Sequence, residues 1–159
     1  MPARQAAAEG RARGKGCRGI FCAAAIELGD GRIVTGKNSE LMHAAPSAVL
    51  NAIKLLAGIP DNIHLLSPDV IRSIVSLKHD ILKGRHPSLH LDEVLIALAI
   101  SSSANTAAQA AMDHLAELRD CEMHLTHVVT PGDKSGLLRL GIRHTSDPLF
   151  ASPDLFVEG

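Results

Sequence analysis

The sequence contains almost no aromatic residues. Phenylalanine occurs only at Phe21, Phe150 and Phe156, and the 159 residues include neither tryptophan nor tyrosine. The core must therefore be aliphatic, because hydrophobic residues still make up 46% of the chain. Proteins that bind single-stranded nucleic acid stack bases on aromatic side chains, and polyanions are attracted by a net positive charge. With few aromatics and a net charge of −1, the sequence predicts no nucleic-acid partner.

Cysteine and long apolar runs are also scarce. The three cysteines, Cys17, Cys22 and Cys121, are too few and too unevenly spaced for a disulfide framework, so we expect free thiols in a reducing compartment. No apolar run approaches the roughly 18 residues that cross a membrane, and the first residues lack the apolar core of a signal peptide. These features predict a cytoplasmic protein without a membrane partner.

Basic residues are concentrated at the start of the chain. Residues 1–22 contain five arginines and lysines against one acid, Glu9, among many alanines and glycines. The basic residues show no periodicity, so we expect a poorly packed tail. A basic arm for nucleic acid and an organellar targeting segment are the alternatives. We expect one α/β domain at 23–150 and a second tail at 151–159.

The central region alternates strand and helix patterns. Strands are expected at 23–28, 32–35, 63–66, 121–129 and 142–145, and helices at 46–57, 68–83, 91–100, 105–119 and 131–140. The apolar run 91–100 could be a strand or a helix, but acids in its first turn favour a helix. On the first helix, Ser47, Asn51 and Lys54 form a narrow polar stripe. This order predicts a three-layer α/β/α fold with a mixed sheet of about five strands.

The order of elements is similar to that of zinc-dependent cytidine deaminases, with two inserted helices. Those enzymes place His-x-Glu at the start of one helix and Pro-Cys-x-x-Cys at the start of the next. Here the corresponding segments are His43-Ala44-Ala45 and Pro68-Asp69-Val70-Ile71-Arg72, so the glutamate and both cysteines are replaced. The sequence therefore predicts a deaminase-like topology without zinc deamination, and it predicts no metal or other cofactor.

Five segments also match a known bacterial family, in order. They read DGRIVTGKNS at 30–39, LNAIK at 50–54, LAGI at 56–59, IHLLSP at 63–68 and LHLDEVLIAL at 89–98. From about Ala23 to Phe150 the chain resembles the C-terminal part of domain-of-unknown-function family 1846, a group of uncharacterised bacterial proteins. The resemblance also implies a subdomain with deaminase-like topology.

The resemblance implies that full members are roughly three times longer than this chain. They carry an upstream glycine-rich segment like a phosphate-binding loop, whereas no G-x-x-x-x-G-K-[ST] motif occurs here. We therefore expect a truncated gene product or an isolated C-terminal domain. Some members are labelled ATP-dependent peptidases, but this sequence contains no His-Glu-x-x-His motif.

One candidate binding site follows from the deaminase-like arrangement. Two helix N-termini would converge at the deaminase pocket, and such ends attract anions. The candidate binding residues are Lys37, Asn38, His43, Ser67, Asp69, Arg72 and His90. Alternatively, Ser67 is simply a helix cap, Arg72 a solvated surface residue and His43 a loop residue. His86 and His90 could share a metal if they lay on one helix, but Pro87 between them favours a loop.

Two functional classes remain open. The leading hypothesis is a non-catalytic C-terminal domain that packs against, or oligomerises, a larger nucleotide-binding protein. The alternative is an enzyme or a small-molecule or anion-binding module that uses the vestigial deaminase-like pocket.

Overall fold

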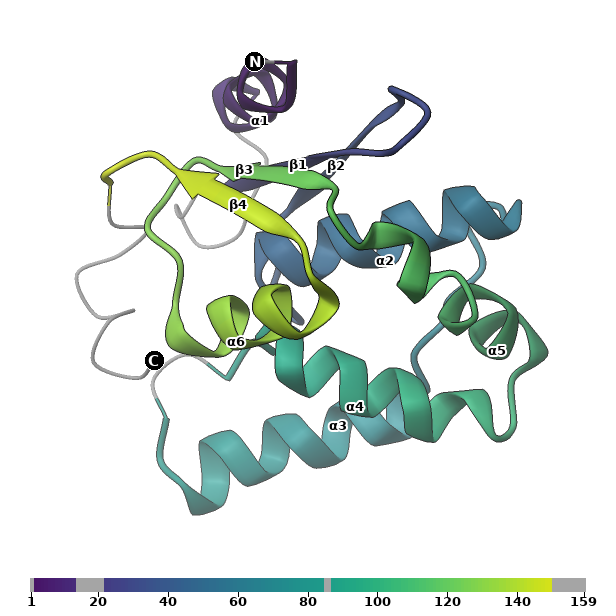
Figure 1. Ribbon diagram of the computed structural model, residues 1–159. Helices are drawn as coiled ribbons and strands as arrows, with labels where there is room; N and C mark the ends of the chain where they lie inside the picture. The colour runs from purple at the N-terminus through teal and green to yellow at the C-terminus, as the bar shows by residue number, and fades with distance from the viewer. Residues whose placement is uncertain (1, 14–21, 85–86, 150–159) are drawn as a thin grey trace.

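The fold is built on one four-stranded mixed sheet. The computed structural model describes residues 2–13, 22–84 and 87–149 (Figure 1). The strands are β1 (Ala23–Glu27), β2 (Ile33–Lys37), β3 (Glu122–Leu125) and β4 (Arg143–Ser146), in the order β2-β1-β3-β4. β1 runs antiparallel to both β2 and β3, and β3 runs parallel to β4.

The predicted hairpin is confirmed and explains the start of the sheet. Leu28 and Arg32 close the turn through a backbone hydrogen bond of 2.9 Å, and Gly31 has a φ of 88°. A positive φ is favourable for glycine because it has no Cβ. The Asp30 carboxylate accepts hydrogen bonds from both the backbone and the side chain of Arg32, which holds the turn in place.

Helices lie on both sides of the sheet. Helix α1 (Pro2–Ala12) covers one face, and α2 (Ala44–Ala57) packs against the other. Beyond α2, Figure 1 shows the remaining helical elements on the same side of the sheet as α2. They are α3 (Pro68–Ser76), a π-helical turn (Leu77–Ile81), α4 (Leu91–Ser102), α5 (Thr106–Met112), a 3₁₀ turn (Leu115–Leu118) and α6 (Pro131–Leu140). Within the described residues, none of these helices is long and apolar enough to span a membrane.

The first segment differs from the tail that we expected at residues 1–22. Residues Pro2–Ala12 form α1, in which Ala3 and Ala7 are fully buried and pack with Ala25 of β1. Alanines four positions apart make a smooth helical stripe that can approach a sheet closely. Nothing in the sequence indicated a packed helix here, because the buried residues of α1 are alanines and the stripe carries no large apolar residue. Residues 14–21 and the predicted tail at 151–159 lie outside the described part of the chain.

The strand that we expected at 63–66 was wrong. These residues lie in an irregular connection before α3, with Leu65 and Leu66 buried in the core. A short apolar run fits a buried connection as well as a strand, because periodicity cannot separate them. The described residues therefore contain four strands rather than five. The helix predicted at 91–100 is confirmed as α4, whereas the helix predicted at 105–119 divides into α5 and the 3₁₀ turn.

The absence of a strand at 63–66 changes which helices follow strands along the chain. Helix α2 directly follows β2, and the next helix that directly follows a strand is α6, after β3, whereas α3 has no strand before it. The succession of hairpin, helix, strand and helix is therefore β1, β2, α2, β3 and α6. The helices α3, α4 and α5 are inserted between α2 and β3.

Two close backbone approaches fix the helices against their neighbours. A Cβ on Gly36 of β2 would lie 2.1 Å from the backbone nitrogen of Ala48, so glycine is needed for α2 to rest directly on the strand. A Cβ on Gly136 of α6 would lie 2.6 Å from the Leu91 Cγ of α4. A core with so few aromatic side chains is filled by this close packing of small residues and aliphatic side chains.

We expect α1 to stabilise the sheet rather than to be dispensable. Ala7→Asp places a charge in the buried α1–β1 contact and should lower the free energy of unfolding by about 1–3 kcal/mol. Ala8→Asp adds the same charge at the exposed neighbouring position and should change it by less than about 0.5 kcal/mol. Urea unfolding of both variants tests this, and equal effects would show that α1 does not dock.

Candidate functional site

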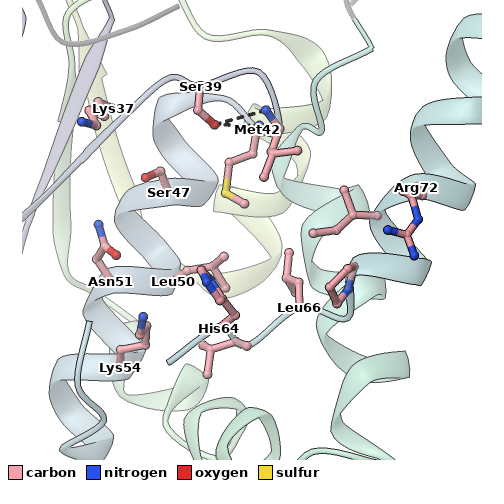
Figure 2. Close-up of a pocket in the computed structure, with 14 residues that line it drawn as sticks. Lys37, Ser39, Met42, Ser47, Leu50, Asn51, Lys54, His64, Leu66 and Arg72 are labelled. Atoms are coloured by element: carbon pink, nitrogen blue, oxygen red, sulfur yellow. Dashed lines mark hydrogen bonds between the residues drawn. The ribbon is translucent and has the colours of Figure 1, made fainter. Parts of the chain in front are cut away.

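A cavity of about 520 Å³ lies between α2 and the beginning of α3 (Figure 2). Its floor is aliphatic, and polar side chains stand around it. The lining residues are Lys37, Ser39, Leu41, Met42, Ser47, Leu50, Asn51, Lys54, His64, Leu65, Leu66, Pro68, Ile71 and Arg72. Small-molecule sites have this size and this combination of an apolar lining with a few polar groups.

One wall of the cavity is the polar stripe of α2. Ser47, Asn51 and Lys54 all line the cavity, which confirms that they share one face of the helix (Figure 2). The Asn51 amide donates to the Thr35 carbonyl at 2.9 Å, and the Lys54 ammonium donates to the Asp61 carbonyl at 2.8 Å. The sequence showed this stripe, but we did not include it in the predicted site. A polar stripe on an otherwise buried helix is the signal that could have identified it.

The opposite wall comes from α3 and the segment before it. Arg72 projects from α3, and His64 comes from the irregular connection that we predicted to be a strand. Arg72 also forms an exposed ion pair with Asp69. Among the described residues, the lining contains three cationic side chains and one histidine but no aspartate or glutamate, so its electrostatic potential favours an anion.

The predicted site residues separate into three groups. Lys37 and Arg72 line this cavity. Asn38, Ser67 and Asp69 do not: the Asn38 side chain accepts a 3.0 Å hydrogen bond from the Cys22 amide, and the Ser67 amide donates to the Ser101 hydroxyl at 2.8 Å. His43 and His90 lie elsewhere, beside Asp133. The binding roles of all seven residues remain predictions.

The His43 group is centred on a buried carboxylate. The side chain of Asp133 is fully buried, and its two oxygens contact the His43 Nδ1 at 2.9 Å and accept from the Leu91 amide at 2.8 Å. His43 is the N-cap residue of α2, and Leu91 begins α4. His90, just before Leu91, forms a reciprocal capping box with Glu93. Asp133 therefore joins the starts of α2, α4 and its own helix, α6.

The starts of α2 and α3, which we expected to converge, bond to opposite ends of α4. The start of α2 meets the start of α4, because the His43 amide donates to the Leu89 carbonyl at 2.9 Å. The start of α3 meets the other end of α4, where the Ser67 amide donates to Ser101. Leu91 and Ser101 are ten positions apart on α4, which corresponds to a rise of about 15 Å. The two starts therefore do not touch each other, but Ser47 and Pro68, from the first turns of α2 and α3, both line the cavity described above.

Burial shapes the ionisation of this cluster. Burial alone would raise the pKa of Asp133, but hydrogen bonds from His43, the Leu91 amide and Thr130, with the charge of His43, together lower that pKa. Burial lowers the pKa of His90, and that of His127 falls to about 4. His127 is only 5% exposed, and its buried Nδ1 has no hydrogen-bond partner among the described residues. At neutral pH, Asp133 is ionised and His127 is neutral.

The donors beside His43 do not fit the zinc site of a deaminase. The helices that begin beside His43 are α4, which opens with Leu91-Asp92-Glu93, and α6, which opens with Pro131-Gly132-Asp133, and neither opening supplies a thiolate. His43 already engages a carboxylate through Nδ1, and the described cysteines, Cys22 and Cys121, are buried next to other elements. Within the described residues, no group of three or more His, Cys, Asp or Glu side chains is arranged to hold a metal ion.

The buried His127 should make stability depend on pH. The pKa of His127 is about 6.5 in the unfolded chain but about 4 in the folded protein, so the unfolded chain binds this proton more readily. The free energy of unfolding should therefore fall by about 3 kcal/mol as the pH decreases through this window. His127→Leu should remove that part of the slope, while His79→Gln, at an exposed histidine, should leave it intact. Urea unfolding from pH 4 to 7 measures the difference, and identical slopes for all three proteins would contradict it.

The comparisons with known proteins agree in the family that they indicate. The family model described as "Domain of unknown function DUF1846, C-terminal" matches residues 1–156. UPF0371 proteins from Corynebacterium aurimucosum and Clostridium tetani are 44% and 38% identical over 151 and 156 residues, or 95% and 98% of this chain. A UPF0371 protein from Corynebacterium diphtheriae is 47% identical over 132 residues, or 83% of this chain. These matches span 28%, 31% and 27% of the three relatives, respectively. The chain therefore belongs to the DUF1846 C-terminal domain family and corresponds to less than a third of the length of these UPF0371 relatives.

Proposed function

We propose that this chain is a non-catalytic C-terminal domain that packs against the remainder of a longer UPF0371-type protein. The observation that carries the proposal is an exposed aliphatic surface on the inserted helices α3 and α4. The chain covers less than a third of its relatives, so most of such a protein lies outside this domain.

The exposed residues form two helical stripes. Leu77 and Ile81 are four positions apart on the π-helical continuation of α3, and Ile96 and Ile100 are four positions apart on α4. Ile81 is 69% exposed and Ile96 is 60% exposed. Helix α3 packs against α4, so both stripes belong to the same helical layer. We call these four residues the α3–α4 stripes.

The packing of α3 supports a missing partner surface. Its apolar residues Val70, Ile71, Ile74 and Val75 are only partly buried, and no residue of α3 is fully buried. Burying an aliphatic side chain completely contributes about 1.5–3 kcal/mol, so further coverage of this helix would stabilise it considerably. Exposed apolar surface of this kind typically marks a protein–protein contact.

The partner that we propose is the upstream part of the same polypeptide. The resemblance implies that this part carries a phosphate-loop-like nucleotide-binding segment, which would make the present domain a structural support for it. A second copy of this chain is the alternative partner, and the experiment below separates the two.

We also propose a deaminase-like topology for the sheet with α2 and α6. The order of hairpin, helix, strand and helix in β1, β2, α2, β3 and α6 supports it. The second motif would then align with Pro131-Gly132-Asp133-Lys134-Ser135 rather than with Pro68, which places Gly132 and Ser135 at the cysteine positions. In this alignment, too, the domain has lost the residues of zinc deamination.

The docking proposal predicts complex formation with the upstream part of a full-length relative. The purified upstream part of the Corynebacterium diphtheriae protein should form a one-to-one complex with this chain in analytical ultracentrifugation. Introducing Ile81→Glu and Ile100→Glu together should weaken that complex at least tenfold, because two charges would be buried in an apolar contact. Leu138→Glu, at an exposed leucine of α6, is the control and should leave the complex intact.

Three results would count against this proposal. The first is a chain that is a monodisperse monomer, binds no hydrophobic dye and forms no complex with the upstream part. The second is a complex that Leu138→Glu weakens as much as the stripe variant does. The third is a stable homodimer that excludes the upstream part, since that outcome would assign the α3–α4 stripes to a second copy of the chain.

A further inference from the structure

We propose that the cavity between α2 and α3 binds an anionic amphipathic small molecule, one with a carboxylate or phosphate-monoester head on an aliphatic body. The site is lined by residues of α2, α3 and the connection between them. It is separate from the α3–α4 stripes, and the isolated chain should suffice to bind the ligand.

A buried lysine without a counter-ion is the main evidence. Lys54 is only 8% exposed, and its ammonium contacts the Asp61 backbone carbonyl. Within the residues that the structure describes, no carboxylate lies within ion-pair distance of it. Burying a charge without an opposite charge is costly, so a bound anion would offset a penalty that the protein alone leaves in place.

Lys78 is a partly buried lysine that has a structural role, and it provides a comparison for Lys54. Lys78 is less buried than Lys54, yet it pairs with the Glu93 carboxylate at 2.7 Å and also donates to the Ser88 carbonyl. Lys54, by contrast, donates a hydrogen bond to the Asp61 carbonyl and has no carboxylate partner among the described residues. The difference is expected if the opposite charge for Lys54 comes from a ligand.

The other basic side chains of the cavity can contribute to binding an anion without disrupting the fold. Lys37 and Arg72 stand at its rim, and His64 faces α2 from the connecting segment (Figure 2). The Arg72–Asp69 pair is exposed on both sides, and exposed ion pairs contribute little stability. The Arg72 guanidinium can therefore turn from Asp69 to a ligand at little cost.

The floor of the cavity defines the rest of the ligand. Met42, Leu50, Leu66 and Ile71 offer an aliphatic surface, so a bare inorganic anion would leave most of the lining unused. Among the described residues that line the cavity, there is no phenylalanine, tyrosine or tryptophan, which disfavours a ligand held mainly by ring stacking. A volume of about 520 Å³ accommodates a head group with an aliphatic chain of moderate length.

Four probes with the same tail and different heads test this assignment. Octanoate and octyl phosphate carry an anionic head, 1-octanol a neutral head and octylamine a cationic head. We expect at least one anionic probe to bind one-to-one in calorimetry with a Kd below about 1 mM, and to raise the melting temperature. The tighter of the two identifies the head group. Octanol and octylamine should bind at least tenfold more weakly.

Two matched lysine variants distinguish a ligand role from a structural one. Lys54→Met should weaken binding of the anionic probe at least tenfold. It should leave the melting temperature of the ligand-free chain unchanged or higher, because an uncompensated buried charge is removed. Lys78→Met removes the ion pair with Glu93, so it should lower the melting temperature and leave probe affinity unchanged. Arg72→Gln, at an exposed rim position, should weaken the probe about threefold or more and keep the fold.

The proposal is overturned if neither anionic probe binds below about 1 mM. It is also overturned if octanol binds as tightly as the tighter of the two anionic probes, since the cavity would then select only for apolar surface. Probe affinity that is unchanged in both Lys54→Met and Arg72→Gln would place the binding site elsewhere.

Discussion

The helical layer depends on one buried carboxylate. Asp133 lies where α2, α4 and α6 begin, and each of these helix starts carries unsatisfied amide groups and the positive end of a helix dipole. Its carboxylate contacts His43 at the first start and the Leu91 amide at the second, while its own amide donates to the Thr130 hydroxyl at the third. A negative charge at this point offsets three positive helix ends that would otherwise repel one another.

The contacts around Asp133 fix how α6 packs against α4 and, through α4, where α3 begins. Gly132 and Gly136 flank it on α6, and a Cβ at Gly132 would lie 2.4 Å from the His90 ring, so α6 approaches α4 closely only because of these glycines. With one end of α4 fixed there, its other end receives Ser67 and the start of α3. The groups that contact the Asp133 carboxylate, the His43 ring and the Leu91 amide, are satisfied by it within the protein. The polar groups of the α2–α3 cavity include Lys54, whose charge has no carboxylate partner among the described residues, and this contrast supports our proposal of a binding site at the cavity.

Local patterns predicted much of the fold but not its long-range pairing. The Asp30-Gly31 turn, the acids at the start of α4 and the glycine after α6 are short-range signals, and the elements that they predicted are present. The start of α3 was paired with His43 because Pro68 matched a motif, whereas the true neighbour, Asp133, lies 90 residues from His43 along the chain. The alanine stripe of α1 was missed because alanine alone does not indicate burial. Lys54 was visible in a polar stripe, but its missing carboxylate partner is evident only once the surroundings are folded.

The most direct test of the central role of Asp133 is a double-mutant cycle with His43. The free energy of unfolding would be measured by urea at pH 7 for the wild type, His43→Ala, Asp133→Ala and the double variant. If Asp133 joins the helix starts, Asp133→Ala alone should cost about 3–5 kcal/mol, and the two changes should couple by about 1–3 kcal/mol. Additive effects and a cost below about 1 kcal/mol for Asp133→Ala would contradict the account.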